Sequence, residues 1–253
     1  MCTNYAPPSR DALRAHFDVS APAGDWKPEV WRGYAAPIIR RAEDGSRVAE
    51  LGHFGLVPPW IRSAADAKKI SAGTMNARSE TVGEKPSFRQ AWRKGHFCLV
   101  PMARFFEPDW RSGHAIRSAI SLSDGVDFGV AGIWSWWRDP ASDPASDVVG
   151  DVAGDSAAEG AADGRSQAPK FTFSLLTINA DAHPVMNQLH RPGDEKRSLV
   201  IVPRADWGHW LSASTELARA LLVPYPASEL RLIAAPLPPR PSRASASRAD
   251  PPA

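Results

Sequence analysis

Cysteine is scarce in this chain: among 253 residues it occurs only at positions 2 and 98. Two cysteines so far apart form neither a disulfide framework nor a cysteine-ligated zinc site. Cys98 lies in the apolar run 97–100, which is typical of a small buried hydrophobic residue. We therefore expect no metal site and no cofactor, and Cys2 is the cysteine left for chemistry.

Long hydrophobic runs are also missing. No apolar segment approaches the roughly 18 residues of a membrane span. The first residues lack the basic region and apolar stretch of a signal peptide, and no glycine-rich phosphate loop occurs. These absences predict a soluble cytoplasmic protein that is not associated with a membrane.

Acidic residues are concentrated in one stretch of the chain. Residues 139–169 form a degenerate four-residue repeat of seven units that each begin with an acid, and Arg165 is their only base. The stretch has a net charge of −6, so the rest of the chain carries +8 although the total is +2. Its small residues, Gly and Pro bury too little surface to offset the entropy of ordering. We predict a disordered insertion between two strands, within a basic domain that suits a nucleic-acid partner.

The C-terminal residues 236–253 are rich in Pro, Arg, Ser and Ala. This composition predicts a second disordered segment. The remaining chain, 1–235 with the interruption at 139–169, is expected to form a single domain.

Hydrophobic patterns along this domain predict strands more often than helices. Ser9 as N-cap, with Leu13 and Phe17 on one face, predicts a helix over 9–18, and the polar residues 61–73 predict a loop. Strands are expected at 37–39, 48–56, 96–101, 103–107, 117–122, 127–134, 171–175 and 198–202, and short helices at 87–93, 204–211 and 214–222. We expect an α+β fold of mainly antiparallel sheets, barrel-like, with a few peripheral helices.

Cys2 directly follows the first methionine, which is normally removed when the second side chain is small. Removal leaves one residue with a free α-amine, of reference pKa about 7.7–8.0, and a thiol, of reference pKa about 8.5. Such a 1,2-aminothiol condenses with an aldehyde to an imine, and the thiol then closes a five-membered thiazolidine. The alternative is that position 2 is simply a disordered terminus.

Three further places carry chemistry-bearing side chains. Asn76, Arg78 and Glu80 lie close together in the segment 74–81. The alternative is that this segment is a turn with a surface ion pair. Glu107 ends an aromatic strand, where a partly desolvated carboxylate suits proton transfer, or where it simply faces solvent. His190 lies in a loop between two predicted strands, where a histidine often has no special role.

Taken in order, these residues resemble the SOS response-associated peptidase (SRAP) family of abasic-site processing proteins. The resemblance rests on Cys2, the Asn-Ala-Arg block at 76–78, the aromatic-aromatic-Glu at 105–107 and His190. Residues 54–60, Phe-Gly-Leu-Val-Pro-Pro-Trp, are also similar to the family's Trp-Gly-Leu-x-Pro-x-Trp. It extends from Cys2 to about residue 210 and identifies the chain as a divergent member.

The resemblance implies a specific activity on DNA. Cys2 would form a thiazolidine with the aldehyde of an abasic site in single-stranded DNA, which shields the lesion. Asn76 would orient the opened sugar, Glu107 would shuttle protons, and His190 would assist sugar ring opening and reversal of the cross-link.

The resemblance further implies how DNA is held. Arg78 would hold a phosphate and Trp60 would stack on a base beside the lesion. We expect a monomer that is cytoplasmic and associates with the nucleoid when bound to DNA.

Departures from the family pattern keep two alternatives open. Thr3 and Asn4 replace the family's Gly-Arg, and the segment after His190 is longer than in the family. The chain is therefore alternatively a single-stranded DNA-binding paralogue that no longer reacts. A third possibility is a thiol peptidase in which Cys2 and His190 form a dyad. In one form of this alternative, the peptidase activity is limited to removal of the protein's own Met1.

Overall fold

The structure is a computed structural model, and it describes residues 2–138 and 170–237. Its strands are β1 (Asn4–Ala6), β2 (Val30–Trp31), β3 (Ala35–Arg41), β4 (Arg47–Phe54), β5 (Asn76–Arg78), β6 (Phe97–Met102), β7 (Arg104–Asp109), β8 (Ile116–Leu122), β9 (Phe128–Trp137), β10 (Lys170–Asn179), β11 (Arg197–Leu199), β12 (Ile201–Val202) and β13 (Leu230–Ala234). Its helices are α1 (Arg10–Phe17), α2 (Ala64–Ser71), α3 (Arg89–Arg93), α4 (Trp207–Leu211) and α5 (Thr215–Ala220), with short 3₁₀ turns at Met186–Gln188, Arg204–Asp206 and Ala227–Glu229.

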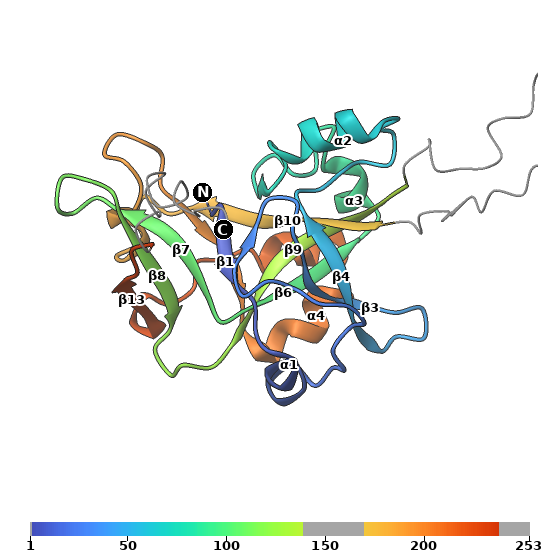
Figure 1. Cartoon of the computed structure of the whole chain (residues 1–253), viewed down its shortest axis with the longest axis horizontal. Coiled ribbons are helices and arrows are strands. Elements are labelled where there is room, and N and C mark those ends of the chain that lie inside the picture. Colours follow the sequence, from blue (N-terminus) through green and yellow to red (C-terminus); the bar gives the residue numbers. More distant parts are fainter. Residues whose placement is uncertain (1, 139–169, 238–253) are drawn as a thin grey trace, which may run out of the picture.

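Five strands close into a barrel. β3 pairs with β4 and β6, β6 pairs with β9, and β9 pairs with β10, all antiparallel. The ring is completed by β10, which pairs with β4 in parallel. In Figure 1 these strands occupy the centre and right of the molecule, with α1 and α4 below them. The barrel-like, mainly antiparallel fold expected from the sequence is confirmed.

A second sheet of five strands lies beside the barrel, in the order β13-β8-β7-β1-β2. All of its described pairings are antiparallel. β1 pairs with β7 through Tyr5 and Phe105, and in Figure 1 β1 lies on the side of this sheet that is next to the barrel strands. This position of β1 matters because Cys2 leads directly into it.

The core follows the alternation of side chains along the barrel strands. Ile38 and Leu175 belong to one buried cluster, together with Cys2 and residues of the second sheet. Their neighbours Ile39 and Leu176 belong to another cluster, which the helices cover with Phe17, Trp92, Trp207 and Trp210. Each barrel strand thus contributes to two packed layers, and the N-terminus is part of one of them.

One sequence-based prediction of a loop is wrong. Residues 64–71 form helix α2, which begins at the N-cap Ser63, whose Oγ accepts a hydrogen bond from the Asp66 N–H at 3.1 Å. The helix buries Ala67 and Ser71 against the barrel. Its small and charged residues lack a broad apolar stripe, so tertiary contacts and the cap decide its formation.

The predicted insertion at 139–169, and all but the first two residues of the predicted tail at 236–253, lie outside the described residues. The insertion connects β9 to β10, and Trp137 is paired with Lys170 in the ladder between these strands. Within 2–138 and 170–237, no helix is long and apolar enough to cross a membrane.

Candidate active site

Cys2 is fully buried and packs in the same cluster as Tyr5, Phe105 and Leu189. The alternative that position 2 is a disordered terminus is therefore wrong. The Cys2 thiol donates a hydrogen bond to the Asn4 carbonyl at 3.2 Å. Burial raises the pKa of this thiol well above its usual range, and the negative charge of Glu107 raises it further. Burial thus favours the protonated form of the thiol.

Asn76 reaches Cys2 from a different part of the chain. It begins β5, which pairs in parallel with β10 and so is a strand rather than the turn considered from the sequence. The Asn76 Nδ2 donates a hydrogen bond to the Cys2 carbonyl at 2.8 Å. Its buried Oδ1 has no hydrogen-bond partner within the described residues, although such atoms are usually paired. The Asn76 Nδ2 thus holds the backbone of Cys2, and the Asn76 Oδ1 is available to accept a further hydrogen bond.

Glu107 and His190 are in direct side-chain contact beside Cys2. The His190 Nε2 lies 3.0 Å from the Glu107 Oε2, and the side chains are only 9% and 3% exposed. The alternative of a solvent-facing acid is therefore wrong for Glu107, and His190 is likewise buried; a role for His190 stays a prediction.

The backbone explains how two distant segments meet at this pair. The His190 N–H donates to the Pro108 carbonyl at 2.8 Å, and Leu189 bridges to Asp109 at the end of β7. His190 has φ of 65°, in the left-handed region that non-glycine residues rarely adopt. Residues held in this region are often found at functional sites, where the surroundings enforce the conformation.

A network of charges surrounds Arg78. Its guanidinium lies 2.7 Å from the Glu195 carboxylate, and Glu195 also pairs with the buried Arg197 at 2.8 Å. Arg197 in turn holds Glu80 through two hydrogen bonds of 2.9 Å. These bonds lower the pKa of Glu80 to about 2. Arg78 is half-exposed and paired, but its partner Glu195 lies outside the segment 74–81 in which a surface ion pair was considered.

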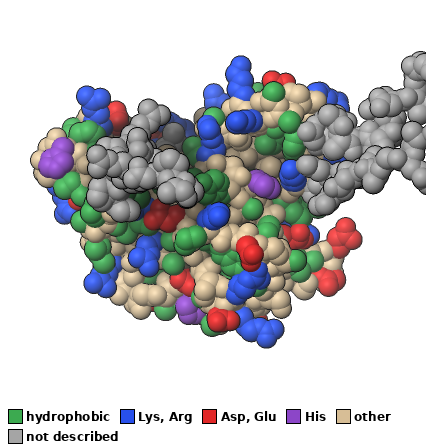
Figure 2. Space-filling model, viewed as in Figure 1, with side chains coloured by type: hydrophobic (Ala, Val, Ile, Leu, Met, Phe, Trp, Pro, Cys, Tyr) green, Lys and Arg blue, Asp and Glu red, His purple; other side chains and the backbone are tan. Residues whose placement is uncertain are grey.

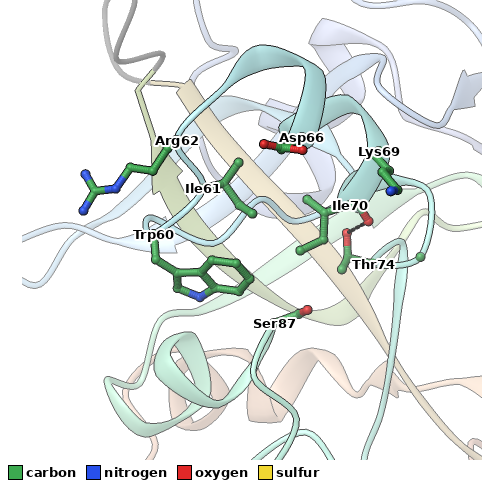
Figure 3. A pocket seen from close by; sticks show the side chains of 9 residues that line it. Trp60, Ile61, Arg62, Asp66, Lys69, Ile70, Thr74 and Ser87 are labelled. Atoms are coloured by element: carbon green, nitrogen blue, oxygen red, sulfur yellow. Dashed lines mark hydrogen bonds between the residues drawn. The ribbon is translucent and has the colours of Figure 1, made fainter.

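Trp60 lies apart from Cys2, on a cavity of about 660 Å³ beside α2 (Figure 3). Half of its surface is exposed. The cavity is lined by Trp60, Ile61, Arg62, Asp66, Lys69, Ile70, Gly73, Thr74 and Ser87. None of the four predicted catalytic residues is among them, but Thr74 stands two residues before Asn76. The cavity and the Cys2 cluster therefore share one chain segment.

Basic side chains gather near this cavity. Figure 2 shows Lys and Arg side chains along the upper edge of the visible face, around α2. Lys68 and Lys69 belong to the last turn of α2, and Arg62 precedes the helix. This distribution gives an anionic polymer a favourable approach to the cavity.

Sequence reasoning missed a polar network behind Cys2. Asn4 is buried, and its Nδ2 donates to Glu29 at 3.0 Å. The same Glu29 oxygen accepts from Arg117 at 2.8 Å, and the Arg117 guanidinium lies 3.4 Å from the centre of the Phe106 ring. Asn4 therefore links β1 to the strand that carries Glu107. No local pattern signals this network, because its members come from four separate segments.

Within the part of the chain that the structure describes, no three His, Cys, Asp or Glu side chains are grouped as a metal ion would require.

Residues 1–236 match the model of the SOS response associated peptidase (SRAP) family. The chain belongs to the SRAP family. Abasic site processing protein YoaM of Bacillus subtilis (strain 168) is 26% identical over 230 residues, which cover 87% of this chain and 84% of that protein. Abasic site processing protein YoqW of the same organism is 32% identical over 130 residues, 49% of this chain and 54% of that protein.

The fold is shared with a solved structure of similar size. A crystal structure of a protein from Bordetella bronchiseptica superimposes with a TM-score of 0.77 at 32% identity, covering 93% of this chain and 100% of that one. The SRAP membership expected from a few motifs therefore extends over the whole described fold.

Proposed function

We propose that this SRAP protein forms a covalent cross-link with abasic sites in single-stranded DNA, using the α-amine and thiol of Cys2 after Met1 is removed. The observation that carries the proposal is one buried cluster. Asn76 is hydrogen-bonded to the Cys2 carbonyl, and the Glu107–His190 pair lies beside it. The names of the relatives YoaM and YoqW support abasic sites as the target.

The chemistry follows from the two nucleophiles on one residue. The Cys2 amine attacks the C1′ aldehyde of the opened abasic sugar, and loss of one water gives an imine. The thiol then adds its sulfur to the imine carbon, and the nitrogen takes up a proton to complete the thiazolidine. The amine reacts first because the sulfur adds to the imine carbon that this step creates; since burial raises the pKa of the thiol, its proton is removed as the sulfur adds.

Glu107 and His190 are placed to handle the protons of these steps. Imine formation needs a proton delivered to the departing water, and ring closure needs one removed from the thiol. A carboxylate and an imidazole 3.0 Å apart can pass a proton between them. His190 is assigned to ring opening of the sugar and to reversal of the cross-link, and Glu107 to the proton shuttle.

Asn76 is assigned to orient the opened sugar. Its Nδ2 is engaged with Cys2, while its buried Oδ1 is available to accept a hydrogen bond from a sugar hydroxyl. Fixing the aldehyde against the amine replaces a bimolecular encounter by reaction within one complex.

DNA is proposed to approach from the side of α2. Trp60 offers a half-exposed aromatic face for stacking on a neighbouring base. Arg62 and Lys69 line the same cavity, and the half-exposed Arg78 lies two residues after Asn76 in β5. Phosphate contacts of this kind position a strand without reading its sequence.

The experiment uses the two cysteines as matched variants. The protein is incubated with an abasic oligonucleotide and separated under denaturing conditions. Wild type and Cys98→Ala should give a shifted, stable band, and Cys2→Ala should give none. A stable band of equal intensity from Cys2→Ala would contradict the proposal. Salt-dependent binding without any covalent product would instead support the non-reacting DNA-binding alternative.

A further inference from the structure

Arg78 is engaged by a carboxylate of its own chain. The Glu195 Oε2 lies 2.7 Å from the Arg78 guanidinium, although both side chains are partly exposed to solvent. Glu195 belongs to the loop between His190 and β11, the segment that is longer than the family pattern. The cation assigned to a DNA phosphate thus already has an anionic partner.

This ion pair is held in place from behind. The other Glu195 oxygen pairs with Arg197 at 2.8 Å, and the Arg197 side chain is only 3% exposed. Arg197 is fixed by two bonds to Glu80 and by a bond of 2.7 Å to the Thr177 carbonyl. Most surface ion pairs contribute little because both side chains must be ordered. Here Glu195 is ordered by the buried arginine.

We propose that Glu195 is an internal competitor of DNA phosphate for Arg78, so that DNA must displace the carboxylate before Arg78 can hold the strand. The inference rests on the proposed function, because it takes Arg78 as a phosphate contact. Carboxylate and phosphate oxygens offer the same geometry to a guanidinium fork, and both need the same donors. Glu195 therefore weakens general binding to single strands and restrains the affinity of the basic surface.

The position of Glu195 gives the competition a second consequence. Lys196, the next residue, donates hydrogen bonds to the carbonyls of His190 and Arg191 at 3.2 and 2.8 Å. A strand that draws Arg78 away from Glu195 acts on the loop that begins at His190. The Arg78–Glu195 contact thus connects Arg78, the residue proposed to hold DNA, with the loop that carries His190.

The test measures binding without cross-linking, using an oligothymidine strand without abasic sites at low salt. Glu195→Gln keeps the size of the side chain but replaces one of its two acceptor oxygens by an NH2 group, and Arg197 retains its two bonds to Glu80. We expect about two- to five-fold tighter binding, the range that one partly exposed ion pair supplies. Asp194→Asn is the matched control, because it removes the same charge from the neighbouring exposed residue.

Combining the Glu195 and Arg78 substitutions distinguishes competition for Arg78 from a general effect of removing one negative charge. In the Arg78→Gln background, Glu195→Gln should change the affinity by less than its effect in the wild type, approaching no change. Thermal unfolding of each variant checks that the fold is kept.

Three results would overturn the inference while leaving cross-linking by Cys2 intact. They are an unchanged affinity of Glu195→Gln, an equal gain from Asp194→Asn, and an equal gain in the Arg78→Gln background. Failure of the wild type to bind single strands at all would overturn the proposed function together with this inference. A cross-linking assay on the same preparations distinguishes the two cases.

Discussion

Glu107 is the residue on which the proposed proton transfers depend most. It lies within a buried pair with His190, and its charge acts on the Cys2 thiol. Gln keeps the shape of this side chain but cannot accept and return a proton. The assignment of Glu107 as shuttle can therefore be tested without opening a cavity.

We predict that Glu107→Gln lowers the initial rate of cross-linking by about a hundredfold, the lower range for loss of a general acid–base group. The rate is followed as the denaturation-resistant product on an abasic oligonucleotide. Glu84→Gln serves as the control, since Glu84 is exposed and should leave the rate unchanged. A Glu107→Gln rate within twofold of the wild type would remove Glu107 from the mechanism.

The residues of the site were predictable to different extents. Cys2, Asn76, Glu107 and His190 were named from motif order, and the structure brings them together as that order implied. The roles assigned to them stay predictions. The partners of Asn4 and Arg78 could not be foreseen, because Glu29, Arg117 and Glu195 become neighbours only through the tertiary fold.

At the scale of elements, β5 and β11 are joined by the charged network of Arg197. Glu80 follows β5, Arg197 begins β11, and β10 lies between them with Thr177 bonded to Arg197. The carboxylate of Glu80 is favoured in the folded protein, where its pKa falls to about 2 from its ordinary value of 4.5. Its contribution to stability is present above pH 4.5 and is lost as the pH falls through about 2.

Glu80→Gln should accordingly lower the free energy of unfolding by about 1 kcal/mol at pH 7, a figure discounted because the side chain is 48% exposed. The difference from the wild type should shrink as the pH falls from 5 toward 2. Chemical denaturation at several pH values measures it, with Glu84→Gln as the reference variant. A difference that stays constant over this range would show that the Glu80 charge does not stabilise the fold.

Elements with a strong local pattern were predicted well. α1 has its Ser9 cap and buried Leu13 and Phe17, and β10 contains the strand predicted at 171–175, although both of its faces are buried rather than one. α2 and β5 were missed. The first lacks an apolar stripe, and the second is a three-residue strand that exists because β10 offers it a partner. Closure of the barrel by the parallel pair of β4 and β10 is likewise a long-range event.

At the scale of the whole molecule, the acidic repeat at 139–169 offsets most of the positive charge of the domain. It connects two strands whose last described pair is Trp137 and Lys170. A single glycine in its place would leave a two-residue hairpin loop of Arg138 and Gly, a favoured length for such connections. The repeat can therefore be removed without displacing the barrel strands.

We predict that this replacement leaves cross-linking intact or makes it faster, because seven acidic residues no longer oppose the approach of DNA. Cross-linking rates at low and high salt measure the effect, which should fade as salt screens the charges. A clear drop in product from a variant with an unchanged unfolding temperature would give the repeat a positive role.

The most direct test of the central claim is the mass and peptide map of the product formed with an abasic oligonucleotide. The account predicts a protein without Met1, joined to the strand with loss of one water. The map should place the DNA on Cys2, and borohydride should add no hydrogens because the thiazolidine holds no imine. A product that retains Met1, or that carries the DNA on another residue, would contradict the account.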